Sequence, residues 1–347
     1  MTAHAHNFLE TDGAFPGLVW GYAFDAEGRA SVITDRPVHD LASPTDGFRW
    51  LHLNLVDRRA CLRLGEQRVL PAETRELFLS HEDDQRSTVI DGTLCAIVQD
   101  GVIAIGRDVE VKRARLHIVA TERFIVTGRF EPLHATRALR ERIDAGVRMH
   151  TPLDILRTLI RAAADRVAAS KRAFDAELDT LEDELIESRA PLRASRLSAI
   201  QRQIVGLHRQ VNGTRSIFQQ LSDEDPHDVP EAFIKVAQSL ENRLDSLLAE
   251  ISALKERARL FQDDVDSRIS SRINANLYLL SRLTALFLPP TLVTGIFGMN
   301  AGGHPLVETT RGFTLAMVCV LVSPVVMYLA LRRSGFWSGV RRNDREH

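Results

Sequence analysis

The chain has 347 residues, of which 44% are hydrophobic and 26% are charged, so it is long enough for two or three folded units and is not globally disordered. Its 44 basic and 46 acidic residues give a formal net charge of -2, which gives no support to a nucleic-acid-binding protein. Cys61, Cys95 and Cys319 are far apart and form no CxxC pair, which fits a reducing compartment. The first ten residues lack a basic segment and an apolar stretch, so we expect no cleavable secretion signal.

The first part of the chain has short runs rich in β-branched and aromatic residues, bounded by Gly, Asp or Pro. These runs predict strands, whereas residues 71–80 predict a helix that Pro71 opens. The last two predicted strands are close enough to form a hairpin, so we expect a mixed sheet in an α/β cytoplasmic domain over residues 1–150. We find no GxGxxG, P-loop or GxSxG motif, so no enzyme is indicated. The predicted strands are residues 17–24, 49–55, 93–100, 114–121 and 123–128.

Long helices are predicted for residues 151–282, a cytoplasmic stalk region. The first helix covers residues 151–188 with Thr151 as its cap, the second covers about 191–221, and the third begins near Glu231 and meets no proline until Pro289. Apolar residues of the third helix recur in alternating steps of four and three, which is a heptad seam that requires partner helices. Steps of four through Ile269, Ile273 and Leu277 then rotate the seam. The seam consists of Leu240, Leu244, Leu247, Ile251, Leu254, Ala258, Phe261 and Val265.

Two apolar segments follow the stalk region. Residues 283–307 and 312–331 contain no Asp, Glu, Lys or Arg, and a bilayer core requires about 20 apolar residues per helix. They predict a transmembrane hairpin over residues 283–331, with spans at about 283–300 and 313–331 and an outer loop at 301–312; a buried hairpin in a soluble core is the alternative. Arginines flank the hairpin and fill the tail, residues 332–347, so both termini are expected in the cytoplasm.

A stripe of Leu, Thr and Gly continues along the first predicted span. Small and hydroxyl residues in a spanning helix indicate either a helix–helix interface or the lining of a narrow pore. Two spans cannot enclose a pathway, so a pore requires an oligomer, and the heptad seam is consistent with one. Pro289 and Pro290 remove two backbone donors, so we expect a kink or local widening there. The stripe consists of Leu280, Thr284, Leu288, Thr291, Gly295 and Gly298.

The sequence Gly298-Met299-Asn300 at the end of the first span resembles the signature of the CorA superfamily of divalent metal-ion transporters. Its frame, LPPTLVTGIFGMN followed by a short loop, a second span and a basic tail, agrees, and the resemblance extends over nearly the whole chain. The continuation AGGHP is similar to the zinc-transporter branch named ZntB, whereas Met299 and Pro290 depart from that branch. The resemblance implies a funnel-shaped homopentamer in which the first spans line the pore and the second spans form an outer ring.

Candidate site residues follow from this frame. A ring of Asn300 side chains, with Gly298 and Met299, offers neutral oxygens to a hydrated cation; ending the helix is the alternative role. Thr284 and Thr291 either place hydroxyls in the pore or bond to their own backbone, and Leu280 and Leu288 either form constrictions or pack at an interface. His304 and Glu308 are candidate metal ligands at the outer mouth, with an exposed histidine in a glycine-rich loop as the alternative. Acidic residues in the stalk of magnesium-type relatives bind regulatory metal, which the resemblance extends to Asp263, Asp264 and Asp266, with a solvated helix face as the alternative.

The sequence therefore predicts a transporter of divalent cations in a bacterial-type inner membrane. Zn²⁺ is the expected cargo, with coupling to protons left open, and no cofactor is expected apart from the transported metal. The expected partners are further copies of the chain, metal ions and the lipid bilayer. A channel for Mg²⁺, Co²⁺ or Ni²⁺ is the first alternative, and a membrane-anchored cytoplasmic scaffold is an alternative of a different class.

Overall fold

The computed structural model describes residues 15–33, 41, 47–82, 84–105, 110–187, 194–227, 229–298 and 310–333. The chain divides into two compact units, residues 1–261 and 262–347. One helix, α6 (Glu231–Gly298), contributes residues to both units. The predicted domain boundaries at residues 150 and 282 remain predictions.

The first unit contains a mixed sheet, as predicted. Its order is β2-β1-β3-β7-β6-β5-β4, and β3 and β7 run parallel while the other neighbouring strands run antiparallel. The predicted hairpin is confirmed as β6 and β7, which pair from His117–Gly128 to Ala120–Ile125. The short strands β2 and β4 were not predicted, and they form the two edges of the sheet. The strands are β1 (Leu18–Phe24), β2 (Ala30–Val32), β3 (Phe48–Asn54), β4 (Arg86–Ile90), β5 (Thr93–Ile105), β6 (Glu110–Ala120) and β7 (Phe124–Arg129).

Helices cover both faces of this sheet. On one face α1 (Arg58–Gly65) and the predicted α2 (Ala72–Phe78) bury Leu64 and Phe78 against Leu53 and Val126 of the strands. Because strand side chains alternate between faces, Trp50 of β3 points to the other face, which α3 (His134–Asp144) and α4 (Pro152–Glu187) cover. The sheet is therefore the middle of three layers. The helices α1 and α3 were not predicted from the sequence.

A distant carboxylate caps α3. The residue before the helix, Leu133, has no capping oxygen in its side chain, so Asp100 of β5 accepts hydrogen bonds from the backbone N–H groups of His134 and Ala135. A register shift between Gln99 and Gly101 places Asp100 for this role. Burial raises the pKa of the Asp100 carboxyl, against the lowering effect of these N–H groups.

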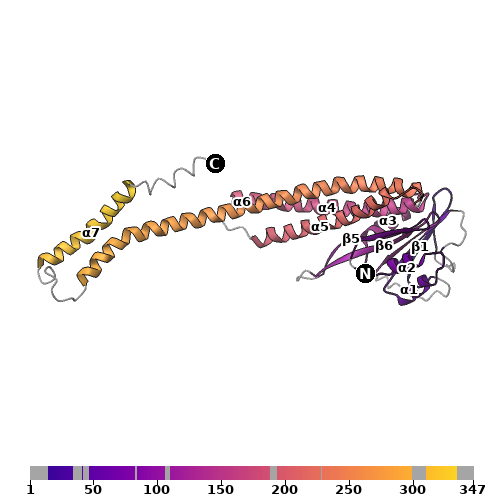
Figure 1. Cartoon of the computed structure of the whole chain (residues 1–347), viewed down its shortest axis with the longest axis horizontal. Helices are drawn as coiled ribbons and strands as arrows, with labels where there is room; N and C mark the ends of the chain where they lie inside the picture. Colours follow the sequence, from indigo (N-terminus) through magenta and orange to yellow (C-terminus); the bar gives the residue numbers. More distant parts are fainter. Residues whose placement is uncertain are drawn as a thin grey trace, which may run out of the picture. The chain divides into compact units, whose positions relative to one another are not determined.

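The long helices form a bundle beside the sheet, in which consecutive helices run in opposite directions (Figure 1). The helix α4 begins with the predicted cap, in which Asp154 N–H donates to Thr151 Oγ1 and Thr151 N–H donates to Asp154 Oδ2. The next helix, α5 (Ala194–Asp223), returns along α4, and α6 runs back again. Gln85 ties α5 to the sheet because its amide contacts Gln210 O at 3.1 Å and Thr214 Oγ1 at 2.7 Å.

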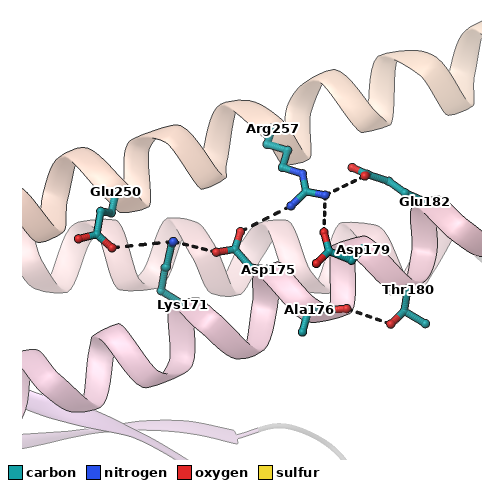
Figure 2. Close-up of polar contacts among 8 residues, drawn as sticks. All are labelled: Lys171, Asp175, Ala176, Asp179, Thr180, Glu182, Glu250 and Arg257. Atoms are coloured by element: carbon teal, nitrogen blue, oxygen red, sulfur yellow. Dashed lines mark hydrogen bonds and ion pairs between the residues drawn. The ribbon is translucent and has the colours of Figure 1, made fainter.

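Ion pairs join α4 to α6 in a ladder (Figure 2). Lys171 of α4 contacts Asp175 of its own helix at 2.8 Å and Glu250 of α6 at 3.8 Å. Arg257 of α6 contacts three carboxylates of α4, namely Asp175 at 3.7 Å, Asp179 at 2.5 Å and Glu182 at 2.7 Å. The pairs Asp179–Arg257, Arg161–Ser239 and Asp165–Arg243 are each separated by 78 residues, and the other pairs by 75 to 82. These similar offsets show that α4 and α6 run parallel.

The described residues of the second unit form the remainder of α6 and one further helix, α7 (Thr310–Arg333). The predicted third helix and second span therefore correspond to α6 and α7. By length and apolar composition, α6 is the one helix among the described residues that meets the criterion for crossing a membrane.

Candidate pore-lining segment

The heptad seam of α6 is covered by helices of the same chain. All eight seam residues from Leu240 to Val265 are buried, each with at most 6% of its surface exposed. Gln201 of α5 donates to Ala258 O of the seam at 2.9 Å, and the ladder fastens α4 on the same part of α6. The interpretation of this seam as a sign of an oligomer is thus wrong. A heptad pattern indicates that a helix needs partner helices, but it does not indicate which chain supplies them.

Beyond Val265 the apolar residues of α6 lose their partners. Ile269, Ile273 and Leu277 are 46%, 54% and 55% exposed, and the exposure continues through the predicted pore stripe at Leu280 and Leu288. The step-of-four segment that follows the heptads is therefore the place where packing within the chain ends. A contiguous exposed apolar surface of this length indicates contact with lipid or with other protein chains.

The hydroxyls of the stripe bond to the backbone of α6. Thr284 Oγ1 donates to Leu280 O at 2.9 Å, and Thr291 Oγ1 donates to Phe287 O at 3.0 Å and to Leu288 O at 2.8 Å. A hydroxyl that donates its hydrogen keeps its oxygen lone pairs, and lone pairs are what a cation binds. The two alternatives for these threonines are therefore compatible.

Nothing among the described residues of the protomer requires glycine at the two glycine positions of the stripe. A Cβ atom built on Gly295 or on Gly298 would meet nothing within 4 Å, and neither residue has a positive φ. Glycine within a helix is nevertheless about 1 kcal/mol less favourable than alanine. The free space beside both glycines is available to a neighbouring helix or to a lumen.

The two prolines do not interrupt α6. Pro289 and Pro290 lie inside the helix, which continues to Gly298, so the expected kink does not take the form of a break. The hydroxyl of Thr291 lies in the same turn and supplies a donor to two carbonyls there.

The predicted acidic residues lie on an exposed part of α6. Asp264 accepts from Arg268 at 3.0 Å, and Asp266 accepts from Gln262 Nε2 at 3.1 Å. Within the described residues of one protomer, no three His, Cys, Asp or Glu side chains are arranged to hold a metal ion. A regulatory site at Asp263, Asp264 and Asp266 would therefore need ligands from a second protomer. Met299, Asn300, His304 and Glu308 lie outside the described residues.

The most strongly perturbed histidines lie in the sheet and were not singled out in the sequence. His52 of β3 and His117 of β6 are fully buried. Burial, helped by the charge of Arg129, lowers the pKa of His52 to about 3, and burial lowers the pKa of His117 to about 4. Neither histidine lies in a sequence pattern that is typical of metal ligands, so neither was a candidate site residue. Their burial becomes apparent only in the folded structure.

Comparisons with known proteins cover nearly the whole chain. Residues 45–333 match the family described as "CorA-like Mg2+ transporter protein". The divalent cation transporter CmaX of Pseudomonas aeruginosa is 28% identical over 315 residues, which are 90% of this chain and 94% of CmaX. The zinc transport protein ZntB of Pectobacterium atrosepticum is 25% identical over 316 residues, which are 90% of this chain and 94% of that protein.

Solved structures show the same fold. The structure of full-length CmaX matches with a TM-score of 0.75 at 26% identity, and the match covers 93% of this chain and 99% of that one. The CorA magnesium transporter from Methanocaldococcus jannaschii matches with a TM-score of 0.72 at 17% identity, covering 92% and 99%. The likeness at 17% identity concerns the fold alone.

Proposed function

Since this chain belongs to the family of CorA-like Mg²⁺ transporter proteins, we propose that it is a homo-oligomeric transporter of divalent cations in a bacterial inner membrane. The observation that carries the proposal is the change along α6, whose heptad-seam residues are buried as far as Val265, whereas Ile269, Ile273, Leu277 and Leu280 are exposed. In this proposal residues 283–300 of each protomer line the pore, residues 313–331 form the second span, and both termini lie in the cytoplasm.

Assembly from several protomers is supported by the exposed part of α6. Gly295 and Gly298 have free space on the Cβ side, which suits either the close approach of a neighbouring helix or an open lumen. The number of five protomers comes only from the resemblance to the CorA superfamily. A monodisperse monomer, measured by light scattering in a detergent that preserves transport, would contradict this proposal.

Zinc is the proposed cargo, and Mg²⁺, Co²⁺ or Ni²⁺ is the alternative. The zinc proposal draws on the AGGHP sequence after Asn300, where His304 offers an imidazole ligand that Zn²⁺ accepts readily. The alternative draws on Met299, which is the residue of the magnesium-type signature. In both cases a ring of Asn300 carbonyl oxygens replaces part of the hydration shell without holding the ion tightly.

The test is metal flux into proteoliposomes containing the purified full-length protein. Zn²⁺ and Mg²⁺ are compared with and without an imposed pH gradient, and the signal of protein-free vesicles is subtracted. Saturable Zn²⁺ uptake is the expected result. Uptake of Mg²⁺ without Zn²⁺ would favour the alternative, and no flux of any divalent cation would favour a membrane-anchored scaffold.

The matched variants are Asn300→Ala and Asn274→Ala. Asn274 is an exposed residue of α6 that lies off the pore stripe, so the same substitution there controls for removal of an amide. We expect Asn300→Ala to lose most of the flux while it still assembles, and Asn274→Ala to retain it. Equal transport rates for both variants would leave Asn300 with only the role of ending the helix.

A further inference from the structure

An apolar groove runs between α6 and α7 in the second unit. It has a volume of about 510 Å³, and Pro289 and Val293 of α6 form one wall. The opposite wall, from α7, contains two polar side chains, Cys319 and Ser323, and the Ser323 hydroxyl donates to Val320 O at 3.3 Å. The groove therefore presents almost no polar group to an occupant. The main residues of the α7 wall are Val318, Val322, Val326 and Ala330.

The dimensions of the groove match one extended hydrocarbon chain. From Val318 to Ala330 the α7 wall rises by about 18 Å at about 1.5 Å per residue. This is close to half of the about 30 Å hydrocarbon core of a bilayer, that is, one leaflet. An apolar groove of this length matches one acyl chain of a leaflet.

A cation lies at one end of the groove. Arg333 follows the lining residue Ala330 by three positions, so it lies on the same face of α7. Arg332 is also exposed but lies on a different face of the helix. An apolar groove of one-leaflet length that ends at a cation is complementary to an amphiphile with a negatively charged head group.

We propose that this groove binds an anionic phospholipid of the cytoplasmic leaflet, with one acyl chain along Val318–Ala330 and the phosphate at Arg333. The site rests on the proposed function, because α7 must cross the membrane with Arg333 at the cytoplasmic side. The bound lipid holds α7 beside the proline-containing turn of α6. Binding requires both the acyl chain and the charged head group.

The test is thermal unfolding of the full-length protein in detergent, titrated with phosphatidylglycerol or with phosphatidylcholine of the same acyl chains. We expect phosphatidylglycerol to raise the unfolding temperature at lower concentrations than phosphatidylcholine does. Arg333→Gln should weaken the phosphatidylglycerol effect by about tenfold, because it removes a charge-assisted contact, whereas the matched Arg332→Gln should leave it unchanged. Glycerol phosphate, which has the head group without acyl chains, should have no effect.

Three outcomes would overturn the proposal. These are equal effects of the two phospholipids, equal losses in Arg332→Gln and Arg333→Gln, and a full effect of glycerol phosphate, which would indicate an anion site. Ala330→Trp should fill the groove and abolish the effect of both lipids, and if that variant does not fold, the arginine pair decides alone. The titration needs no transport, so lipid binding without metal flux would contradict only the proposed function, and flux without lipid preference would contradict only this site.

Discussion

The imidazole of His52 stacks on the indole of Trp20, with the ring centroids 4.3 Å apart. Its Nδ1 atom lies 2.8 Å from Thr127 Oγ1 on the neighbouring strand, and its Nε2 atom has no hydrogen-bond partner among the described residues. A proton on Nε2 would therefore place a positive charge in the interior without a compensating acceptor. The sheet is built to hold this histidine in its neutral form.

The stability of the folded chain should fall as the pH falls below about 6.5. The folded-state pKa values of His52 and His117, about 3 and about 4, lie below the value of about 6.5 for an unfolded chain. Between those limits the unfolded chain binds protons that the folded chain does not, so each histidine removes about 1.4 kcal/mol of stability per pH unit. The measurement is the thermal unfolding of the detergent-solubilised protein between pH 7.5 and pH 4.5.

The control for this prediction is His52→Gln, which does not titrate. The variant is expected to be less stable at pH 7.5, so the slope with pH is compared and not the stability at one pH. We expect a shallower slope than in the parent. An unchanged slope would mean that His52 does not contribute to the acid sensitivity, and that His117 and carboxylates account for it.

Replacing Arg257 by Gln should weaken the attachment of α6 to α4. The substitution leaves Asp175, Asp179 and Glu182 without their shared cation. Because these side chains are partly exposed, we expect a loss of about 1 kcal/mol and not more. The loss should shrink in high salt, which screens exposed charges. Thermal unfolding at low and high salt measures both effects.

Arg259→Gln provides the comparison for Arg257. It is an exposed arginine two residues further along α6, and it removes the same charge from the same helix. We expect a change close to zero for this variant. Equal destabilisation by both substitutions would mean that net charge, and not the ladder, determines the effect.

The substitution Gly295→Ala tests whether the free space beside Gly295 is needed for transport and not for folding of the protomer. Nothing lies within 4 Å of the added Cβ, and alanine favours the helix by about 1 kcal/mol. We therefore expect normal protein yield together with a marked loss of metal flux in proteoliposomes, because the methyl group enters a neighbour's space or the lumen. Gly206→Ala of α5, where a Cβ also meets nothing, is the control and should transport normally. Unchanged flux in Gly295→Ala would remove Gly295 from the proposed pore.

His304→Ala should raise the apparent KM for Zn²⁺ more than that for Mg²⁺. Neutral imidazole binds Zn²⁺ well and contributes little to Mg²⁺ binding. The difference should shrink below the ordinary pKa of histidine, about 6.5, because a protonated ring in the parent is no longer a ligand. Initial rates of uptake of both metals at two pH values give the comparison. Equal losses for both metals would indicate damage to the pore, and no loss would leave His304 as a loop residue.

Local sequence patterns predicted the elements that carry their own signals. The helix from Thr151 could be predicted because Thr151 and Asp154 form its cap in place, whereas α3 could not, because its cap, Asp100, is 34 positions before the helix. The strands β2 and β4 were missed because they are short edge strands whose exposed faces show no continuous apolar run.

The candidate site was predictable to a different extent. The stripe from Leu280 to Gly298 follows from helical spacing, and the structure places it on one helix. Periodicity could not reveal that the heptads before it are satisfied inside the chain, because that depends on how α4 and α5 fold back. Arg257 was missed for the same reason, since its three carboxylates belong to another helix.

The register between α4 and α6 determines how far α4 covers α6. An offset of 78 residues brings Asp183, in the last turns of α4, level with Phe261, the last residue of the first unit. The length of α4 thus determines how much of α6 remains exposed to lipid and to neighbouring chains. Removing a heptad from the end of α4 would uncover Phe261. Insertions and deletions there would therefore move the boundary between folding and assembly, although they change no residue of the stripe.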